Sequence, residues 1–319
     1  MTRCLVTGAF GQIGTELTRV LRRKHGSDNV WATGRRLPSD AESIGPAAVL
    51  DVTDPAALQD TLKRLEIDVV YHLAARLSAV AEQDPLGAWE INVGGLRNVL
   101  EAARATHVRQ LFWPSSIAVF GPETVRVDVP QETVMRPTTI YGIAKVTGEL
   151  LCEYYVKRYG LDVRGVRYPG VISSGSLPGG GTTDYAVEIF YAALQEGHYR
   201  CFLREDCVLP MIYMPDCLKA ALNLMDAPRA NLEHHNAFNL AAMSFSAGEL
   251  AAEIRRHLPD FRCAFEPDER QQIADSWPES LDDEAARQEW GWAPDYDLAA
   301  MTRDMLTRLE ARLRLSGRL

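Results

Sequence analysis

The chain has 319 residues, of which 46% are hydrophobic and 24% are charged, a composition that supports a large globular core. Its net charge of −9 argues against the clustered basic surface that nucleic acids or anionic membranes require. The first residues lack the long apolar stretch of a signal peptide, and no apolar run approaches the roughly 20 residues that span a bilayer, so we expect a cytoplasmic protein.

Short apolar runs alternate with longer amphipathic stretches through the first half of the chain. The apolar runs predict six strands, at residues 4–7, 30–33, 48–50, 68–73, 110–113 and 163–168. Apolar side chains at three- and four-residue spacing predict helices after the first strand, at 55–65, at about 86–105 and from near 143. Apolar strands that alternate with helices are typical of an α/β fold, so we expect a Rossmann-type doubly wound parallel sheet.

The alternation ends after Pro169-Gly170. Residues 171–183 are rich in Gly, Ser and Thr, which predicts a loop beside a site. Further on, Asp216 is the expected N-cap of a helix through Leu218–Met225. Two parts are therefore expected: a Rossmann domain of residues 1–170 rejoined by about 209–242, and a smaller C-terminal α+β lobe of residues 171–208 and 243–319.

Three glycines, Gly8, Gly11 and Gly14, lie between the first predicted strand and the first predicted helix. In a dinucleotide-binding loop the first glycine permits a tight turn, the second lets the backbone approach a pyrophosphate, and the third lets helix pack on strand. The exposed N–H groups and the positive end of the helix dipole attract the phosphates. The position of the pattern therefore predicts dinucleotide binding, with a purely structural turn as the alternative.

The residues that follow the second and third strands bear on which dinucleotide is bound. About 20 residues beyond the loop, where an acid commonly holds the ribose of NAD, the chain has Gly34 followed by Arg35 and Arg36. Two guanidiniums can pair with a 2′-phosphate, so these residues alone favour NADP; the alternative is that both arginines face solvent. Asp51-Val52 is placed to hydrogen-bond the adenine edge, although an Asp there is also a common helix cap.

Tyr141 and Lys145 lie four residues apart, on one face at the start of a predicted helix. A free tyrosine has a pKa near 10, and a nearby ammonium together with a cationic nicotinamide can lower that pKa. Ser116 ends the fifth predicted strand, at the edge where open α/β sheets bind ligands. A hydroxyl there can hold a substrate oxygen while Tyr141 removes its proton; the alternative is two exposed helix residues.

These features resemble the extended short-chain dehydrogenase/reductase superfamily, which includes the sugar-nucleotide 4-epimerases. The resemblance covers the glycine loop, His72-Leu73-Ala74-Ala75, Asn92, Ser116 and Tyr141-x3-Lys145. The chain is also similar to the short-chain type of L-threonine 3-dehydrogenase, in blocks spread from end to end. These blocks are residues 168–174 (YPGVISS), 178–190 (PGGGTTDYAVEIF), 209–217 (LPMIYMPDC), 242–245 (AMSF) and 273–278 (IADSWP).

The resemblance implies NAD-dependent, metal-independent oxidation of the C3 hydroxyl of L-threonine to L-2-amino-3-oxobutyrate. It implies Tyr141 as general base, Lys145 as the group that lowers its pKa and holds the nicotinamide ribose, and Ser116 as the residue that orients the hydroxyl. The positions expected to hold the dinucleotide are Gly8, Phe10, Gly11, Gln12, Ile13, Gly14, Gly34, Arg35, Asp51, Val52, Leu73, Ala74, Ala75, Asn92, Tyr141, Lys145 and Tyr168. The positions expected around the substrate are Ser78, Ser116, Tyr141, Thr182, Thr183, Asp184 and Trp277.

Several of these positions keep a second interpretation. Asp184 is the expected partner of the substrate ammonium, with hydroxyls for the carboxylate, or else a helix N-cap before Tyr185–Leu194. Trp277 either shields the site or belongs to the core. Gly34 departs from the acid common in the family, which leaves NADP as the alternative to NAD, and Ala81 replaces a glycine often seen after Ser78.

Two other functions stay open. A sugar-nucleotide 4-epimerase shares the Tyr, Lys and Ser set, and a non-catalytic dinucleotide-sensing protein shares the fold but has no need of the Tyr141–Lys145 pair. A 4,6-dehydratase is disfavoured because Ser116-Ile117-Ala118 lacks an acidic pair. We expect a small-molecule substrate, no metal because the six cysteines are scattered, and a homodimer formed through apolar helices around 89–100 and 150–159.

Overall fold

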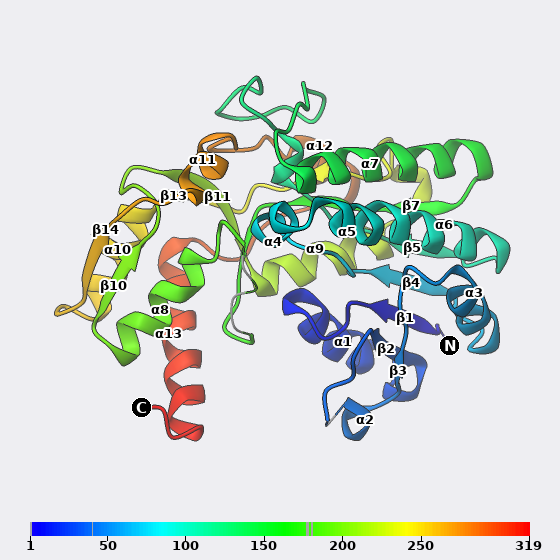
Figure 1. The fold of residues 1–319 in the computed structure, drawn as a ribbon, viewed down its shortest axis with the longest axis horizontal. Coiled ribbons are helices and arrows are strands. Elements are labelled where there is room, and N and C mark those ends of the chain that lie inside the picture. The colour runs from blue at the N-terminus through cyan, green and yellow to red at the C-terminus, as the bar shows by residue number, and fades with distance from the viewer. Residues whose placement is uncertain (1, 40, 177–178, 180) are drawn as a thin grey trace.

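A six-stranded parallel sheet forms the centre of one half of the molecule (Figure 1). The computed structural model describes residues 2–39, 41–176, 179 and 181–319, without the side chains of residues 42 and 43. The strand order is β3-β2-β1-β4-β5-β7, and every neighbouring pair is parallel, which confirms the predicted Rossmann-type sheet. The strands are β1 (Cys4–Thr7), β2 (Val30–Gly34), β3 (Ala47–Val49), β4 (Val69–His72), β5 (Gln110–Phe112) and β7 (Asp162–Arg164).

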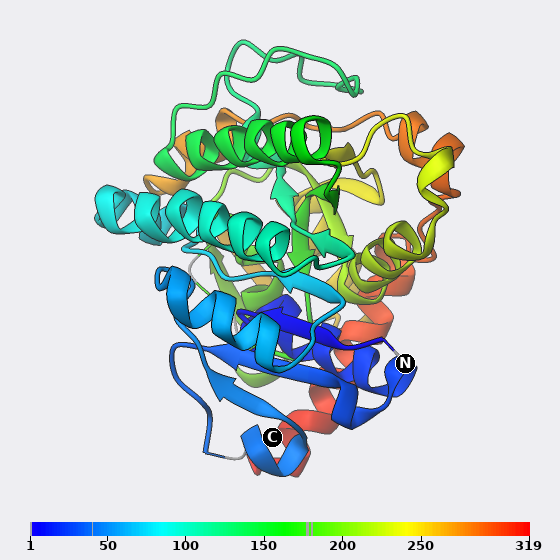
Figure 2. The ribbon, with the colours of Figure 1, turned by 90° about the vertical axis from the view of Figure 1, so that its right-hand side faces the viewer.

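Helices cover both faces of this sheet, because alternate side chains of the apolar strands point to opposite sides. In β1, Cys4 and Val6 pack in one buried cluster and Leu5 packs in another. The first cluster contains α1 (Gln12–His25) and α9 (Met214–Asp226). The second contains α3 (Pro55–Arg64), α6 (Gly95–Ala105) and α7 (Ile140–Tyr159), which lie side by side along one face (Figure 2).

The single strand predicted at residues 163–168 is wrong, because two separate strands, β7 and β8 (Val166–Tyr168), occupy this stretch. The chain leaves the main sheet after β7, and β8 pairs instead with β6 (Ser115–Ser116) and β12 (Phe238–Asn239). The break occurs at Gly165, where an added Cβ would lie 2.1 Å from the carbonyl oxygen of Trp113. Only glycine permits this close backbone approach. At this point the segments that follow β5 and β7 both leave the main sheet.

Three helix predictions need correction at their ends. The stretch 86–105 consists of α5 (Pro85–Trp89), a π-helical segment (Glu90–Gly94) and α6. Helix α7 begins at Ile140, earlier than predicted, because the Thr139 side chain caps it by accepting from the Gly142 N–H. Asp216 is not an N-cap: α9 begins at Met214, and the Asp216 carboxylate accepts from the backbone N–H groups of Asp295 and Tyr296.

The second half of the chain adds smaller elements beside the sheet (left in Figure 1). The predicted loop 171–183 begins later than expected, because β9 runs to Ile172; Pro178 and Gly180 of that loop lie outside the described residues. A three-stranded sheet has the order β13-β11-β9, and β10 pairs with β14. These strands are β9 (Gly170–Ile172), β10 (His198–Cys201), β11 (Val208–Tyr213), β13 (Met243–Ser246) and β14 (Arg262–Phe265).

The C-terminal helix α13 (Leu298–Leu315) completes the core of this half. Its Met301, Met305 and Leu309 are buried in one cluster with Trp277 and Tyr141. The remaining helices are α2 (Ala41–Ile44), α4 (Ser78–Gln83), α8 (Tyr185–Gln195), α10 (Ala247–His257), α11 (Arg270–Asp275) and α12 (Glu284–Trp290), with short 3-10 turns at Ser27–Asn29, Ile117–Val119 and Arg229–Asn231. None of the helices within the described ranges has the length and apolar character needed to cross a bilayer.

Candidate active site

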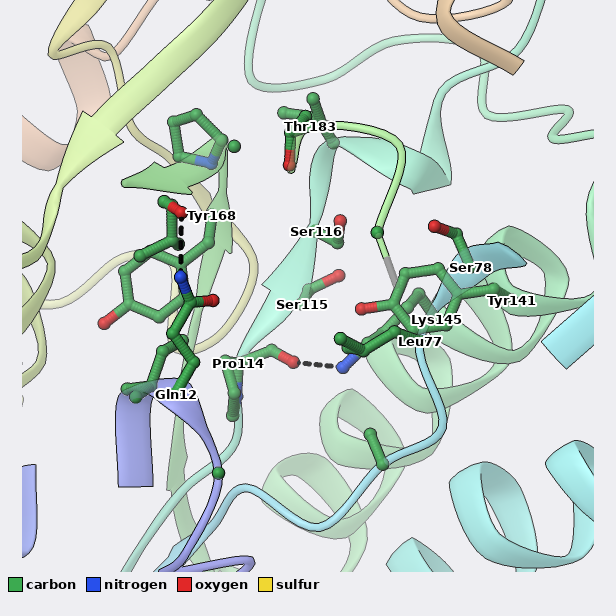
Figure 3. A pocket seen from close by; sticks show the side chains of 18 of the residues that line it. Gln12, Leu77, Ser78, Pro114, Ser115, Ser116, Tyr141, Lys145, Tyr168 and Thr183 are labelled. Atoms are coloured by element: carbon green, nitrogen blue, oxygen red, sulfur yellow. Dashed lines mark hydrogen bonds between the residues drawn. The ribbon is translucent and has the colours of Figure 1, made fainter. Parts of the chain in front are cut away.

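A cavity of about 240 Å³ opens at the carboxyl edge of the main sheet, where β1 and β4 end, beside β6 of the small sheet (Figure 3). Two neighbouring pockets extend it along the glycine loop towards the ends of β2 and β3. Every predicted site residue except Asn92 lines one of these three spaces. The fold therefore brings together segments that are far apart in the sequence, from the glycine loop at residues 8–14 to Trp277 after α11.

The glycine loop has the tight geometry that a pyrophosphate cradle needs. Gly8 has a φ of +68°, and an added Cβ there would lie 2.7 Å from the backbone of Leu73 and Ala74. At Gly14 an added Cβ would lie 2.2 Å from the carbonyl oxygen of Gly8. Gly11 is exposed at the start of α1, so its backbone is open to a phosphate at the helix N-terminus. The loop therefore fits a dinucleotide.

A buried hydrogen bond fixes the two strands that flank the loop. The Thr7 hydroxyl and His72 Nδ1 are 2.7 Å apart at the ends of β1 and β4. Complete burial lowers the pKa of His72 to about 3, so the imidazole is neutral at physiological pH. This neutral pair lies directly before the glycine loop and sets the spacing of the strand ends.

The far end of the cleft is lined by Phe10, Gly34, Arg35 and Arg36. Asp51 lies in the adjacent pocket, and its carboxylate accepts from the Thr53 N–H at 2.9 Å and the Thr53 hydroxyl at 2.8 Å. The Thr53 N–H is the main cause that holds the pKa of Asp51 below its usual range. The helix cap that the sequence left open for Asp51 is instead Asp54, which accepts from the N–H of Ala57.

Two predicted cofactor residues have their polar groups bonded to the protein itself. Asn92 is buried, donates to the Arg76 carbonyl and accepts from the Arg76 N–H, so it fixes the segment after β4 rather than lining a pocket. The Tyr168 hydroxyl donates to the Cys217 carbonyl at 2.7 Å, so Tyr168 presents its ring to the cavity. Both residues support the shape of the site.

Tyr141, Lys145 and Ser116 lie together on one wall of the cavity (Figure 3). The Tyr141 hydroxyl points towards the serines of β6, and the Ser116 side chain lies close enough to lower the pKa of the phenol. Lys145 Nζ donates to the Pro114 carbonyl at 2.5 Å and lies 4.5 Å from the Trp113 ring centre. It lies 5.6 Å from the centre of the Tyr141 ring, close enough for charge on one group to affect the other.

Burial dominates the pKa values of this pair. It raises the pKa of Tyr141 to about 12, against the opposing hydrogen bond from Ser116. Burial lowers the pKa of Lys145 to about 8, against the opposing influence of Cys152 and Glu149. Burial therefore outweighs any lowering of the Tyr141 pKa by the Lys145 ammonium, so the lowered pKa that the sequence suggested is not found in the protein alone.

The predicted substrate end of the cavity is lined by Ser78, Thr182, Thr183, Asp184 and Trp277. The Thr182 hydroxyl is buried without a hydrogen-bond partner among the described residues. Asp184 accepts from the Gly181 N–H at 2.7 Å; it occupies the N-cap position of α8, but its side chain makes no capping hydrogen bond. Trp277 is buried in the core and also lines the cavity, so both interpretations of this residue hold.

A buried ionic network behind this wall escaped the sequence analysis. Glu149, one helical turn beyond Lys145, accepts from the Ser115 hydroxyl at 2.5 Å. Arg167 of β8 donates to both carboxylate oxygens of Glu149, at 3.0 and 2.9 Å, and also bonds to Asn239. An arginine inside a predicted apolar strand was the one indication in the sequence, because a buried guanidinium requires a partner.

Comparison with known proteins identifies relatives along almost the whole chain. Residues 4–241 match the profile of the NAD dependent epimerase/dehydratase family. An uncharacterized epimerase/dehydratase of Staphylococcus saprophyticus is 47% identical over 315 residues, covering 98% of each chain.

Solved structures of L-threonine dehydrogenases share the fold closely. The enzyme from Phytophthora infestans has a TM-score of 0.95 and 48% identity, covering 98% of this chain and 100% of that one. A monomeric L-threonine 3-dehydrogenase from a metagenome database has a TM-score of 0.94 and 46% identity, covering 97% and 99%. The likeness therefore includes both the glycine loop and the substrate end of the cavity.

Removing the charge of Glu149 tests the buried network. Glu149→Gln should lower the free energy of unfolding by about 3 kcal/mol, because Arg167 is then buried without a counter-charge. The control is Glu153→Gln one turn later, where a 37% exposed carboxylate pairs with Lys157 and the loss should stay below about 1 kcal/mol. Urea titration followed by circular dichroism measures both; equal losses would contradict a special role for Glu149.

Proposed function

The chain belongs to the NAD dependent epimerase/dehydratase family, of the extended short-chain dehydrogenase/reductase type, and we propose that it is an L-threonine 3-dehydrogenase. The observation that carries the proposal is the substrate end of the cavity. Thr182, Asp184 and Trp277 belong to two of the sequence blocks that resemble this enzyme, and they face Tyr141 across one small space. The solved L-threonine dehydrogenases at 46–48% identity support the same assignment.

The glycine loop is proposed to hold the pyrophosphate, Asp51 the adenine, and Lys145 the nicotinamide ribose. When bound, the oxidised dinucleotide supplies the hydride acceptor and a positively charged nicotinamide ring. We propose NAD as the oxidant, as the resemblance implies; the arginines beside Gly34 are treated separately below. Residues 1–170 with about 209–242 are the proposed dinucleotide-binding domain, and 171–208 with 243–319 the proposed substrate lobe.

Tyr141 is the proposed general base. As the C3–H bond breaks and its electron pair leaves as hydride, the proton of the C3 hydroxyl passes to the Tyr141 phenolate and the C3–O bond becomes a carbonyl. The product is L-2-amino-3-oxobutyrate. Ser116, whose side chain helps to lower the pKa of the phenol, orients the substrate hydroxyl, and the Lys145 ammonium stabilises the phenolate.

The polar groups opposite Tyr141 suit an amino acid. Asp184 is the proposed partner of the substrate ammonium, and the hydroxyls of Ser78, Thr182 and Thr183 are the proposed donors to its carboxylate. We propose a cytoplasmic enzyme of this small-molecule substrate.

A homodimer is the proposed assembly. Ile143, Leu150 and Tyr154 form a stripe along α7, with exposed fractions of 42%, 64% and 51%, and Leu86 of the neighbouring α5 is 82% exposed. A contiguous apolar surface of this kind is typical of a protein interface. The monomeric relative makes the oligomeric state a real question.

The dimer is tested by placing a charge on this stripe. Leu150→Glu should convert a dimer into a monomer, because an unpaired carboxylate at an apolar interface is costly to bury. Light scattering at micromolar concentration gives the mass. Leu315→Glu is the control, since this 91% exposed residue ends α13 and lies outside α7; a monomeric parent chain would end the proposal.

The dehydrogenase proposal is tested by absorbance at 340 nm with L-threonine and NAD, and in parallel NADP. We expect threonine-dependent reduction, and Tyr141→Phe should lower kcat by at least about 100-fold while dinucleotide binding persists, because only the proton acceptor is lost. Binding without reduction by the parent chain would favour a dinucleotide sensor. Conversion of UDP-glucose without threonine oxidation would favour the epimerase.

The charge of Lys145 should set the pH dependence of the reaction. Burial raises the pKa of Tyr141, so the rate rises with pH as phenolate forms; Lys145, with a pKa of about 8, loses its supporting charge as pH rises further. Lys145→Met should depress the rising limb of kcat by roughly 10- to 100-fold below pH 8, where Lys145 is charged, and by less above that pH, the effect of one charge at this distance. Lys145→Arg keeps the charge and should leave that limb in place; identical profiles for the two variants would refute this role.

A further inference from the structure

The pocket at the end of β2 lacks the carboxylate that commonly binds an unmodified ribose. Its lining consists of Gly8, Phe10, Gly11, Gly34, Arg35 and Arg36, so no acidic side chain of the described residues faces it. An acid about 20 residues beyond the glycine loop would accept from the 2′-hydroxyl of NAD, whereas an arginine there accommodates a 2′-phosphate. The lining, with its two arginines and no acid, therefore suits a 2′-phosphate.

The Phe10 ring occupies the space where a side chain at position 34 would begin. A Cβ added to Gly34 would lie 3.0 Å from Cδ2 of Phe10, closer than ordinary van der Waals contact. A glycine at this position leaves the pocket open beside the ring, and an aspartate would displace it. A ribose-binding acid at position 34 would therefore require the Phe10 ring to move.

Both arginines are available to a ligand. Arg35 and Arg36 are exposed, and neither has a hydrogen-bond or ion-pair partner among the residues that the structure describes. The nearest acid on the adenine side, Asp51, has its carboxylate engaged by Thr53. Asp51 attracts Arg35, since that arginine helps to lower the pKa of the Asp51 carboxyl. Two adjacent, exposed guanidiniums that line an open pocket are nevertheless a strong attraction for a dianionic phosphate.

We propose that Arg35 and Arg36 bind a phosphate on the 2′-oxygen of the adenosine ribose, so that the chain binds NADP at least as tightly as NAD. The inference rests on the dinucleotide site of the proposed function and is independent of the substrate. It adds a specificity-determining element at the opposite end of the cleft from Tyr141.

Isothermal titration calorimetry of the full chain with 2′,5′-ADP and 5′-AMP isolates the 2′-phosphate from the rest of the cofactor. We expect 2′,5′-ADP to bind roughly 10- to 100-fold more tightly, the range that charge-assisted hydrogen bonds supply. The double variant Arg35→Ala/Arg36→Ala should lose that difference and leave 5′-AMP binding within about threefold. Arg23→Ala, which removes an exposed arginine of α1 outside the pocket, should change the affinity for neither ligand.

A second variant and the full dinucleotides complete the test. Gly34→Asp supplies the missing acid and should weaken the binding of NADP more than the binding of NAD, although the Phe10 ring must shift to make room. Equal affinities of 2′,5′-ADP and 5′-AMP, or an unchanged difference in the double arginine variant, would overturn the inference while leaving threonine oxidation with NAD intact. Tight binding of 2′,5′-ADP without any oxidation of threonine would overturn the dehydrogenase proposal alone.

Discussion

One buried ion pair, Glu149 with Arg167, joins the helix that carries Tyr141 and Lys145 to the strands beside it. Glu149 receives hydrogen bonds from Ser115 on β6 and from Arg167 on β8, so a single carboxylate connects three elements. Removing two charges from water is expensive, and the pair is stable only when its hydrogen bonds are complete. The network thereby allows one arrangement of α7 against β6, and this arrangement places the Tyr141 phenol beside Ser116.

The cavity exists because two strands leave the sheet at the same level. Pro114 follows β5 and Gly165 follows β7. The two segments then enter a separate small sheet, in which Ser116 pairs with Tyr168. Open α/β folds bind ligands at the carboxyl ends of their strands. Here the departure of the strands widens that edge, and residues 181–184 and Trp277 of the later part of the chain line it from the other side.

The sequence was most informative where a local pattern dictates the structure. Apolar runs located the strands of the main sheet, and the spacing of Gly8, Gly11 and Gly14 located the cradle because each position requires a missing side chain for its own contact. The interruption at Gly165 could not be predicted, since it depends on the Trp113 carbonyl far away in the chain. Asp216 fits the pattern of a cap, yet its partners are backbone groups of residues 295 and 296, which no local pattern contains.

The position of α13 has a consequence for how the protein is made. All six strands of the parallel sheet lie within the first 164 residues, so that sheet can pair while the later part of the chain is still on the ribosome. Trp277 and Tyr141, in contrast, share their core with Met301, Met305 and Leu309, which are synthesised much later than the strands of the sheet. The nascent chain can therefore assemble its dinucleotide cradle first, whereas the apolar support of the opposite end forms only once residues 301–309 have left the ribosome.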